Sequence, residues 1–360
     1  MNSEPSTSKK NRLLRLRKSL EGLDALLLLN ASHIRYLTGF TGSAGALLIG
    51  PNWMTLLVDG RYITQAQGEA PEVTTFEFRN RIDGIAAVLG EHQVGIMGCD
   101  AAVLTVAEYW QLEKKLSGVK LEPLDQGLQD LRAVKDDQEV LLIREAAKIA
   151  GQALAAVREL VRPGIREREI ALELDYRIRQ MGGEKVAFET IVAAGPNAAL
   201  PHATPGDRQV VAGDAVVFDY GAVFAGYHSD ETCTCFVGHH DARQREVYDR
   251  VRMAHDRAIA AIRPGVACGE IDRVVRATLA EAGLESHFSH GTGHGVGLDI
   301  HEVPRLATGR VEILQAGMVV TVEPGVYLPG LWGMRIEDTV LVTESGCEIL
   351  TPTAKDLTIL

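Results

Sequence analysis

The sequence has few of the features that mark membrane and secreted proteins. Its longest apolar stretch, residues 25–29 (ALLLL), is far shorter than the roughly 20 residues that span a bilayer, and it predicts a buried strand. The five cysteines are scattered and odd in number, which argues against a disulfide framework and favours the reducing cytoplasm. We therefore expect a cytoplasmic protein without a membrane partner.

Basic residues are also scarce. The formal net charge is −11, from 37 basic and 48 acidic residues, so nucleic acid is not expected as a partner. The one basic block, residues 9–18, begins a predicted surface helix at residues 9–21. Neither a long apolar run nor a small-residue cleavage site follows it, so we interpret it as a helix and not as a targeting signal.

The length of 360 residues favours two domains. The first 130 residues alternate helix-like and strand-like patterns, with strands expected at residues 25–29, 54–58 and 94–97. The apolar pattern then lapses into charge at residues 130–138 (DLRAVKDDQ). We predict an α/β domain at residues 1–132 and a second domain at residues 139–360.

The second domain repeats one order of elements. A long helix is predicted from Glu139, because apolar residues recur there at helical spacing. The further expected elements are a helix at residues 167–181, a β-hairpin at 214–237, helices at 242–262 and 268–282, and strands near 318–322 and 336–342. Helices followed by strands, twice over, predict an α+β domain with internal pseudo-symmetry.

The predicted hairpin carries Asp219 and Asp230 at mirror positions about its turn. Cross-strand neighbours on one face lie close together, so these carboxylates are expected to face each other. Opposed carboxylates repel, and a bound cation removes the conflict. The alternative is a pair of solvated aspartates on an exposed face.

A glycine-rich stretch, residues 289–302, contains His290, His294 and His301. The spacing of its glycines excludes a dinucleotide-binding fingerprint. A zincin helix is excluded as well, because Gly-Thr-Gly between His290 and His294 disfavours a helix. The composition predicts a backbone packed closely around another group.

Two further carboxylates, Glu323 and Glu337, each follow an apolar strand-like stretch. An ionised glutamate in such a place needs a partner. Arg335 could satisfy Glu337 as a plain ion pair. Together with the aspartates and one neutral histidine, however, the four carboxylates balance two divalent ions, for which Mn²⁺ is the first expectation, with Co²⁺ or Zn²⁺ as alternatives. A hydroxide shared by two such ions would hydrolyse an acyl bond.

The order Asp219, Asp230, His294, Glu323, Glu337 in these contexts resembles the pita-bread metallopeptidases, which include methionine aminopeptidase, prolidase and aminopeptidase P. The resemblance covers residues 139–360. It implies that Asp219 chelates one ion, that Asp230 and Glu337 bridge the pair, and that His294 and Glu323 hold the other. Glu323 would also carry a proton from the bridging water to the leaving amine.

Within that family, Pro201-His202 and the spacing of His290, His294 and His301 resemble the branch that cleaves Xaa-Pro bonds. The resemblance implies that His202 and His301 contact the substrate and stabilise the tetrahedral intermediate. His290 would line the proline pocket, and Arg335 would orient Glu337. Any one of these histidines alone would be better explained as a core histidine.

Residues 36–42 (YLTGFTG) resemble the creatinase-type N-terminal domain of the same branch, which methionine aminopeptidases lack. The leading hypothesis is therefore an Xaa-Pro aminopeptidase that acts on peptides with proline at the second position. The alternatives are an Xaa-Pro dipeptidase (prolidase), in which a residue caps the pocket and binds the proline carboxylate, and a non-catalytic pita-bread binding protein. The resemblance also implies a homodimer.

One position departs from the family pattern. Many relatives carry arginine where this chain has Cys233. We expect this difference to change the polarity of the substrate groove.

Overall fold

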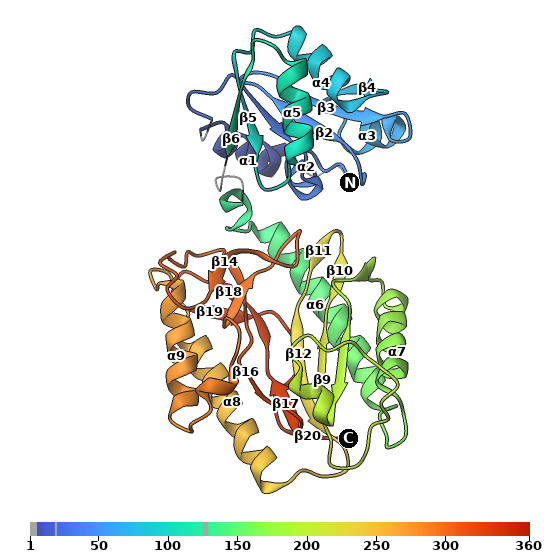
Figure 1. Ribbon diagram of the computed structural model, residues 1–360, viewed down its shortest axis with the longest axis vertical. Helices are drawn as coiled ribbons and strands as arrows, with labels where there is room; N and C mark the ends of the chain where they lie inside the picture. The colour runs from blue at the N-terminus through green and yellow to red at the C-terminus, as the bar shows by residue number, and fades with distance from the viewer. Residues whose placement is uncertain (1–5, 19, 125–128) are drawn as a thin grey trace. The chain divides into compact units, whose positions relative to one another are not determined.

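The computed structural model describes residues 6–18, 20–124 and 129–360. The chain divides into two compact units, residues 1–132 and 133–360, which are coloured from blue to green and from green to red (Figure 1). Among the described residues, no helix combines the length and the apolar character of a membrane span.

The N-terminal unit is an α/β layer built on one six-stranded sheet. The strand order is β4-β3-β2-β1-β5-β6, with β1 antiparallel to β2 and parallel to β5. Its elements are α1 (Ser6–Lys18), β1 (Ala25–Leu28), α2 (Ala31–Thr38), β2 (Ala46–Ile49), β3 (Met54–Asp59), α3 (Ile63–Glu69), β4 (Thr74–Phe78), α4 (Arg81–Gly90), β5 (Ile96–Asp100), α5 (Val106–Lys115), β6 (Lys120–Leu124) and η1 (Asp130–Arg132).

Two predicted boundaries in this unit differ from the structure. The first helix begins at Ser6 and ends at Lys18, earlier than the predicted residues 9–21, of which residue 19 lies outside the described residues. The strand expected at residues 94–97 is β5, which begins at Ile96. Its start is set by Asp24, whose carboxylate accepts hydrogen bonds from the backbone N–H groups of Gly95 and Ile96.

The C-terminal unit contains two helix pairs with strands between them. Figure 1 shows α6 and α7 on one side of the strands and α8 and α9 on the other. The first half comprises α6 (Asp137–Arg158), α7 (Glu167–Gln180), β7 (Lys185–Val186), β8 (Ile191–Ala194), η2 (Gly195–Ala199), β9 (Ala215–Tyr220), β10 (Ala222–Phe224), β11 (Tyr227–His228) and β12 (Glu231–Phe236). The second half comprises α8 (Ala242–Ala261), α9 (Cys268–Ala280), η3 (Glu285–His287), β13 (Gly293–Gly295), β14 (Glu302–Leu306), β15 (Val319–Val322), β16 (Gly325–Leu328), β17 (Trp332–Arg335), β18 (Asp338–Val342), β19 (Cys347–Ile349) and β20 (Thr358–Ile359).

Each half has its own sheet and its own core. One sheet has the order β20-β12-β9-β8 and the other the order β14-β13-β15-β18-β19. Apolar side chains of α6 and α7 pack on the first sheet, and those of α8 and α9 pack on the second. The sheets meet where Thr232 forms a backbone bridge with Glu337. The predicted order of helices followed by strands, twice over, is confirmed.

The hairpin of β9 and β12 has a different register from the one predicted. Asp219 lies opposite Thr232, and the register places Asp230 opposite Gly221. The prediction that the two aspartates directly oppose each other is therefore wrong. The reason is that the connection is not a simple turn, because β10 pairs with β11 and β7 in a small separate sheet. The offset of two residues still leaves both aspartates on one face of the pair, since side chains alternate along a strand.

Candidate metal centre

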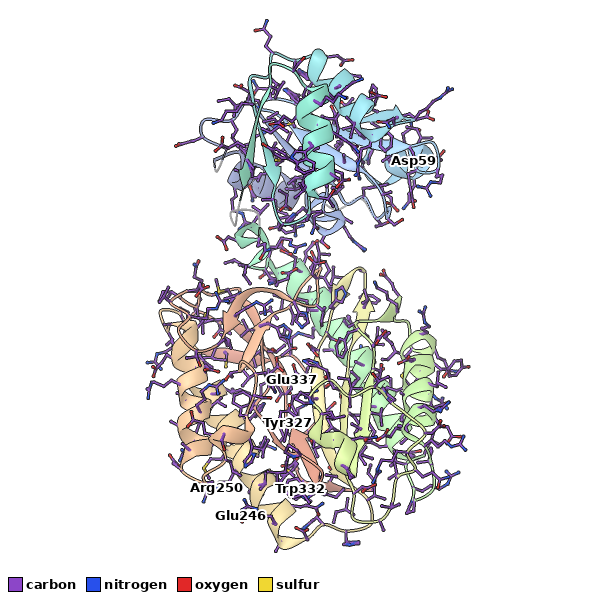
Figure 2. All side chains as sticks on the ribbon, viewed as in Figure 1. Asp59, Glu246, Arg250, Tyr327, Trp332 and Glu337 are labelled. Atoms are coloured by element: carbon purple, nitrogen blue, oxygen red, sulfur yellow. The ribbon has the colours of Figure 1, made fainter. Side chains whose placement is uncertain are left out.

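Four carboxylates and one imidazole converge on one cavity of about 460 Å³. Asp219 comes from β9 and Asp230 directly precedes β12, whereas His294 lies on β13, Glu323 follows β15 and Glu337 precedes β18. Both sheets therefore contribute to the cavity. Figure 2 shows Glu337 in the middle of the unit, between its two halves.

The separations suit a site for cations. His294 Nε2 lies 3.5 Å from Asp230 Oδ2 and 3.5 Å from Glu323 Oε1. Single ligand atoms of Asp230, His294 and Glu337 all lie within 4.8 Å of one another, and these three residues are buried. One ion could contact all three side chains.

The buried carboxylates of the cavity would be stabilised by bound positive charge. Burial, followed by the negative charges of Glu337 and Asp219, raises the pKa of Asp230 well above its usual range. Burial, followed by the charges of Glu323 and Asp219, raises the pKa of Glu337 in the same way. Asp219 Oδ1 is buried and has no hydrogen-bond partner among the described residues. This set of donors fits divalent cations with a preference for oxygen ligands.

Arg335 contacts Asp219 and not Glu337. Its guanidinium donates a hydrogen bond to Asp219 Oδ2 at 2.5 Å. Nε donates to Thr232 Oγ1 at 3.1 Å, and that hydroxyl donates to Glu337 Oε2 at 2.6 Å. The described contacts include no direct ion pair between Arg335 and Glu337. Thr232 lies between the two residues, so an orienting effect of Arg335 on Glu337 would act through that hydroxyl.

His290 lies at one wall of the cavity and is held in a single tautomer. Arg335 donates a hydrogen bond to the Tyr327 hydroxyl at 2.8 Å, so that hydroxyl donates its own proton to His290 Nε2, also at 2.8 Å. Nδ1 then carries the imidazole hydrogen and donates to the carbonyl of Gly291 at 2.8 Å. Burial lowers the pKa of His290, which agrees with a neutral ring.

His202 and His301 also line the cavity. The ring of His301 lies 4.4 Å from that of His294, centroid to centroid, at an angle of 74°. Partial burial, followed by the charges of His294 and Arg305, lowers the pKa of His301 to about 4. His301 is therefore neutral at pH 7 and can donate one N–H group.

The glycines around His294 are required by the approach of neighbouring strands. A Cβ atom on Gly293 would lie 2.0 Å from the carbonyl oxygen of Thr321, and one on Gly295 would lie 2.3 Å from that of Val303. Both distances are far below van der Waals contact, so these positions exclude any side chain. The group around which this stretch packs is the backbone of β14 and β15.

Arg305 is a site residue that the sequence analysis missed. It lies directly opposite His294 in the pairing of β13 with β14 and lines the cavity. It forms no ion pair or hydrogen bond with any residue that the structure describes. The sequence did contain a signal for Arg305. Side chains two residues apart in a strand lie on the same face, so Arg305 is expected on the same face as Val303 and His301.

Cys233 does not contribute to the wall of the cavity. Its side chain is buried in the core below the first sheet, and it is not among the residues that line the cavity. The expectation that Cys233 changes the polarity of the groove is therefore wrong. The reason is the pairing of the two strands. Cys233 lies opposite Phe218, the chain neighbour of Asp219, so Cys233 and Asp219 point to opposite faces of the sheet.

Comparisons with known proteins agree with a metal-dependent hydrolase. The sequence matches metallopeptidase family M24 over residues 142–344 and the creatinase/prolidase N-terminal domain over residues 12–134. The chain therefore belongs to metallopeptidase family M24. Membership of this family makes it a hydrolase that uses divalent metal ions, so the prediction of an enzyme is confirmed.

Individual relatives align over nearly the whole chain. The Xaa-Pro dipeptidase of Pyrococcus furiosus is 36% identical over 352 residues, which cover 97% of this chain and 99% of the relative. The solved structure of an Xaa-Pro dipeptidase from Bacillus anthracis is 36% identical with a TM-score of 0.95, covering 98% of this chain and 100% of that one. The structure of an X-Pro aminopeptidase from Thermotoga maritima is 33% identical with a TM-score of 0.90, covering 96% and 100%.

Proposed function

We propose that this protein is an Xaa-Pro dipeptidase, which hydrolyses the bond between the two residues of a dipeptide that ends in proline. The observation that carries the proposal is Arg305, a guanidinium without a protein partner among the described residues, in the wall of the cavity opposite His294. A guanidinium can bind a carboxylate, such as that of a C-terminal proline, through two parallel hydrogen bonds. The dipeptidase relatives support the same assignment.

The metal site that we propose consists of Asp219, Asp230, His294, Glu323 and Glu337. Four carboxylates carry four negative charges, which two divalent ions would neutralise, and Mn²⁺ is the ion that we expect, with Co²⁺ or Zn²⁺ as alternatives. Such ions supply an acidified water as nucleophile and polarise the scissile carbonyl.

The side chains around the proposed ions would then handle protons and charge. A carboxylate oxygen of Glu323, which accepts a hydrogen bond from Thr321 Oγ1 at 3.3 Å, would take the proton of the attacking water and deliver it to the departing proline nitrogen. His301, and His202 beside it, would donate N–H groups to the oxygen of the tetrahedral intermediate.

The substrate would lie between two recognition elements. Proline fixes its own φ and lacks an amide hydrogen, so a dedicated pocket is needed for it. His290, held by Tyr327, would contact the proline ring from one side. Arg305 would bind the carboxylate that follows directly after the ring.

An Xaa-Pro aminopeptidase, which takes longer peptides, is the second candidate. The likeness to the X-Pro aminopeptidase of Thermotoga maritima favours it. This was the leading hypothesis from the sequence. The two enzymes differ in whether a residue beyond proline is tolerated, because such a residue replaces the carboxylate with a neutral amide.

The deciding experiment compares an Xaa-Pro dipeptide with the matching Xaa-Pro-Yaa tripeptide, using the Mn²⁺-loaded protein. We expect rapid hydrolysis of the dipeptide and little of the tripeptide. Equal or faster cleavage of the tripeptide would establish the aminopeptidase instead.

A further inference from the structure

Behind the proposed metal site lies a buried lysine, Lys355, which joins the two sheets. Its side chain is 3% exposed. The ammonium group contacts Glu231 Oε1 and lies 3.1 Å from Asp338 Oδ1. Both carboxylates are as deeply buried as the lysine, so three charged groups share one water-poor space.

Glu231 and Asp338 are the chain neighbours of two proposed metal ligands. Asp230 precedes Glu231, and Glu337 precedes Asp338. Successive side chains in extended backbone point to opposite faces. Accordingly, Asp230 and Glu337 line the cavity, whereas Glu231 and Asp338 do not.

The two carboxylates belong to different sheets. Glu231 begins β12 in the first sheet, and Asp338 begins β18 in the second. The backbone bridge between Thr232 and Glu337 lies at the same junction. The Lys355 ammonium group therefore connects the two sheets next to the residues, Asp230 and Glu337, that each sheet contributes to the cavity.

The C-terminal segment that carries Lys355 adds two weaker contacts to the same carboxylates. Thr351 Oγ1 donates to Asp338 Oδ1 at 2.5 Å. The backbone N–H of Thr353 donates to Glu231 Oε1 at 3.2 Å. The side chains of Thr351 and Lys355 and the backbone of Thr353 thus all reach the acidic pair from one short segment.

A buried lysine is costly unless it is paired, and two buried carboxylates close together are costly unless a cation separates them. Lys355 pairs with both carboxylates across the junction of the two sheets, and His255 Nε2 lies 3.2 Å from Asp338 Oδ2 as a further partner of that carboxylate. The spacing of the sheets at this junction sets the distance between Asp230 and Glu337.

We infer that Lys355 is a positioning residue of the metal centre: it ties Glu231 to Asp338 and so holds the carboxylates of Asp230 and Glu337 at the separation that two shared ions require. The inference rests on the proposed metal site. Partners that hydrogen-bond metal ligands change metal affinity by about 10- to 100-fold when they are removed, and Lys355 would act on Asp230 and Glu337 through their chain neighbours.

The test measures Mn²⁺ binding to the full-length protein in the absence of substrate. Lys355→Met keeps the unbranched side chain up to the position of Cε and removes the charged ammonium group. The matched control is Lys135→Met, because Lys135 is equally buried and pairs with buried Glu302 at 3.2 Å, but neither residue is the chain neighbour of a proposed metal ligand. Competition with a chelator gives the dissociation constants, and electron paramagnetic resonance at saturating Mn²⁺ reports the magnetic coupling between the two ions.

We expect Lys355→Met to bind Mn²⁺ about 10- to 100-fold more weakly than the parent protein and to show altered coupling at saturation. Lys135→Met should keep both the parent affinity and the parent coupling. Parent-like binding and coupling in a folded Lys355→Met protein would overturn the inference. So would equal losses in the two lysine variants, since the effect would then follow from any unpaired buried carboxylate.

Should Lys355→Met fail to fold, Asp338→Asn takes its place, because it removes one of the two ion pairs without changing the volume of the side chain. Weaker Mn²⁺ binding by that variant supports the inference, and parent-like binding overturns it. Hydrolysis of Xaa-Pro dipeptides is measured in a separate assay. Two Mn²⁺ ions bound by the parent protein without cleavage of Xaa-Pro dipeptides would reject the proposed function alone, whereas no Mn²⁺ binding at all would reject both proposals.

Discussion

His294 and Arg305 lie directly opposite each other on the neighbouring strands β13 and β14. Cross-strand partners have their Cβ atoms about 4.5–5.5 Å apart. The backbones that carry a proposed metal ligand and the exposed Arg305 side chain are therefore one strand spacing apart. The Arg305 side chain lines the same cavity, where it would bind the terminal carboxylate of a substrate whose scissile carbonyl lies at the proposed metal site.

Replacing Arg305 by glutamine should weaken the recognition of dipeptides. Loss of hydrogen bonds to a charged group costs about 1.5–3 kcal/mol, so kcat/KM for an Xaa-Pro dipeptide should fall about 10- to 100-fold. The control substrate is the corresponding Xaa-Pro amide, which lacks the carboxylate. Parent protein and variant should cleave the amide at similar rates, and a selective loss on the amide would contradict the role of Arg305.

Replacing Asp230 by asparagine should remove both activity and metal. The variant keeps its shape but loses a charge that lies 3.5 Å from His294 and among buried carboxylates. Elemental analysis of the purified protein should show fewer bound ions, and peptide hydrolysis should fall to background. Asp249→Asn on the surface of α8 is a matched control, since its half-exposed carboxylate pairs with Arg245, away from the cavity. If Asp230→Asn kept full metal content and activity, its bridging role would be refuted.

Replacing Tyr327 by phenylalanine should loosen His290. The hydroxyl donates to His290 Nε2 and accepts from Arg335, so its removal leaves a buried guanidinium and a partly buried imidazole short of a partner. We expect the free energy of unfolding to fall by about 1–3 kcal/mol and KM for dipeptides to rise more than kcat falls. Urea denaturation and steady-state kinetics measure the two effects. An unchanged KM would show that His290 does not help to hold the proline ring.

Removal of metal should make stability depend on pH in a specific direction. In the metal-free protein the pKa values of Asp230 and Glu337 are raised, so the folded form keeps protons that the unfolded chain has released. A raised carboxyl pKa contributes stability below the unfolded value of about 4 and loses it as pH rises toward the folded value. Chelated protein should therefore melt at falling temperatures as the pH rises above the ordinary carboxyl pKa of about 4.

Bound Mn²⁺ should abolish that decline, because the ions take the place of the protons. Melting temperatures of chelated and Mn²⁺-loaded samples should thus diverge as the pH rises. Identical curves for the two samples would argue against a cation site among these carboxylates.

Replacing Gly293 by alanine should disrupt the strand that carries His294. The new Cβ atom would lie 2.0 Å from the carbonyl oxygen of Thr321, so β13 or β15 would have to move. We expect a loss of about 3 kcal/mol in the free energy of unfolding, together with weaker Mn²⁺ binding. Gly346→Ala is the control, because no atom lies within 4 Å of its added Cβ. Comparable effects of the two substitutions would contradict this explanation of the glycine-rich stretch.

Local patterns in the sequence were enough for the class of fold and for the choice of candidate residues. The apolar periodicity predicted both helix pairs, and carboxylates placed after apolar strands predicted Glu323 and Glu337 as site residues. Such signals survive in a sequence because a helix or strand is formed by residues that are close along the chain.

Only the tertiary structure decided which of these groups meet. The register of β9 against β12 places Asp219 opposite Thr232, and Arg335 pairs with Asp219 from 116 residues away. Lys355 reaches Glu231 across 124 residues. Contacts of this kind depend on how two sheets close upon each other, and that closure is set by the packing of the whole unit, which has no local periodicity to reveal it.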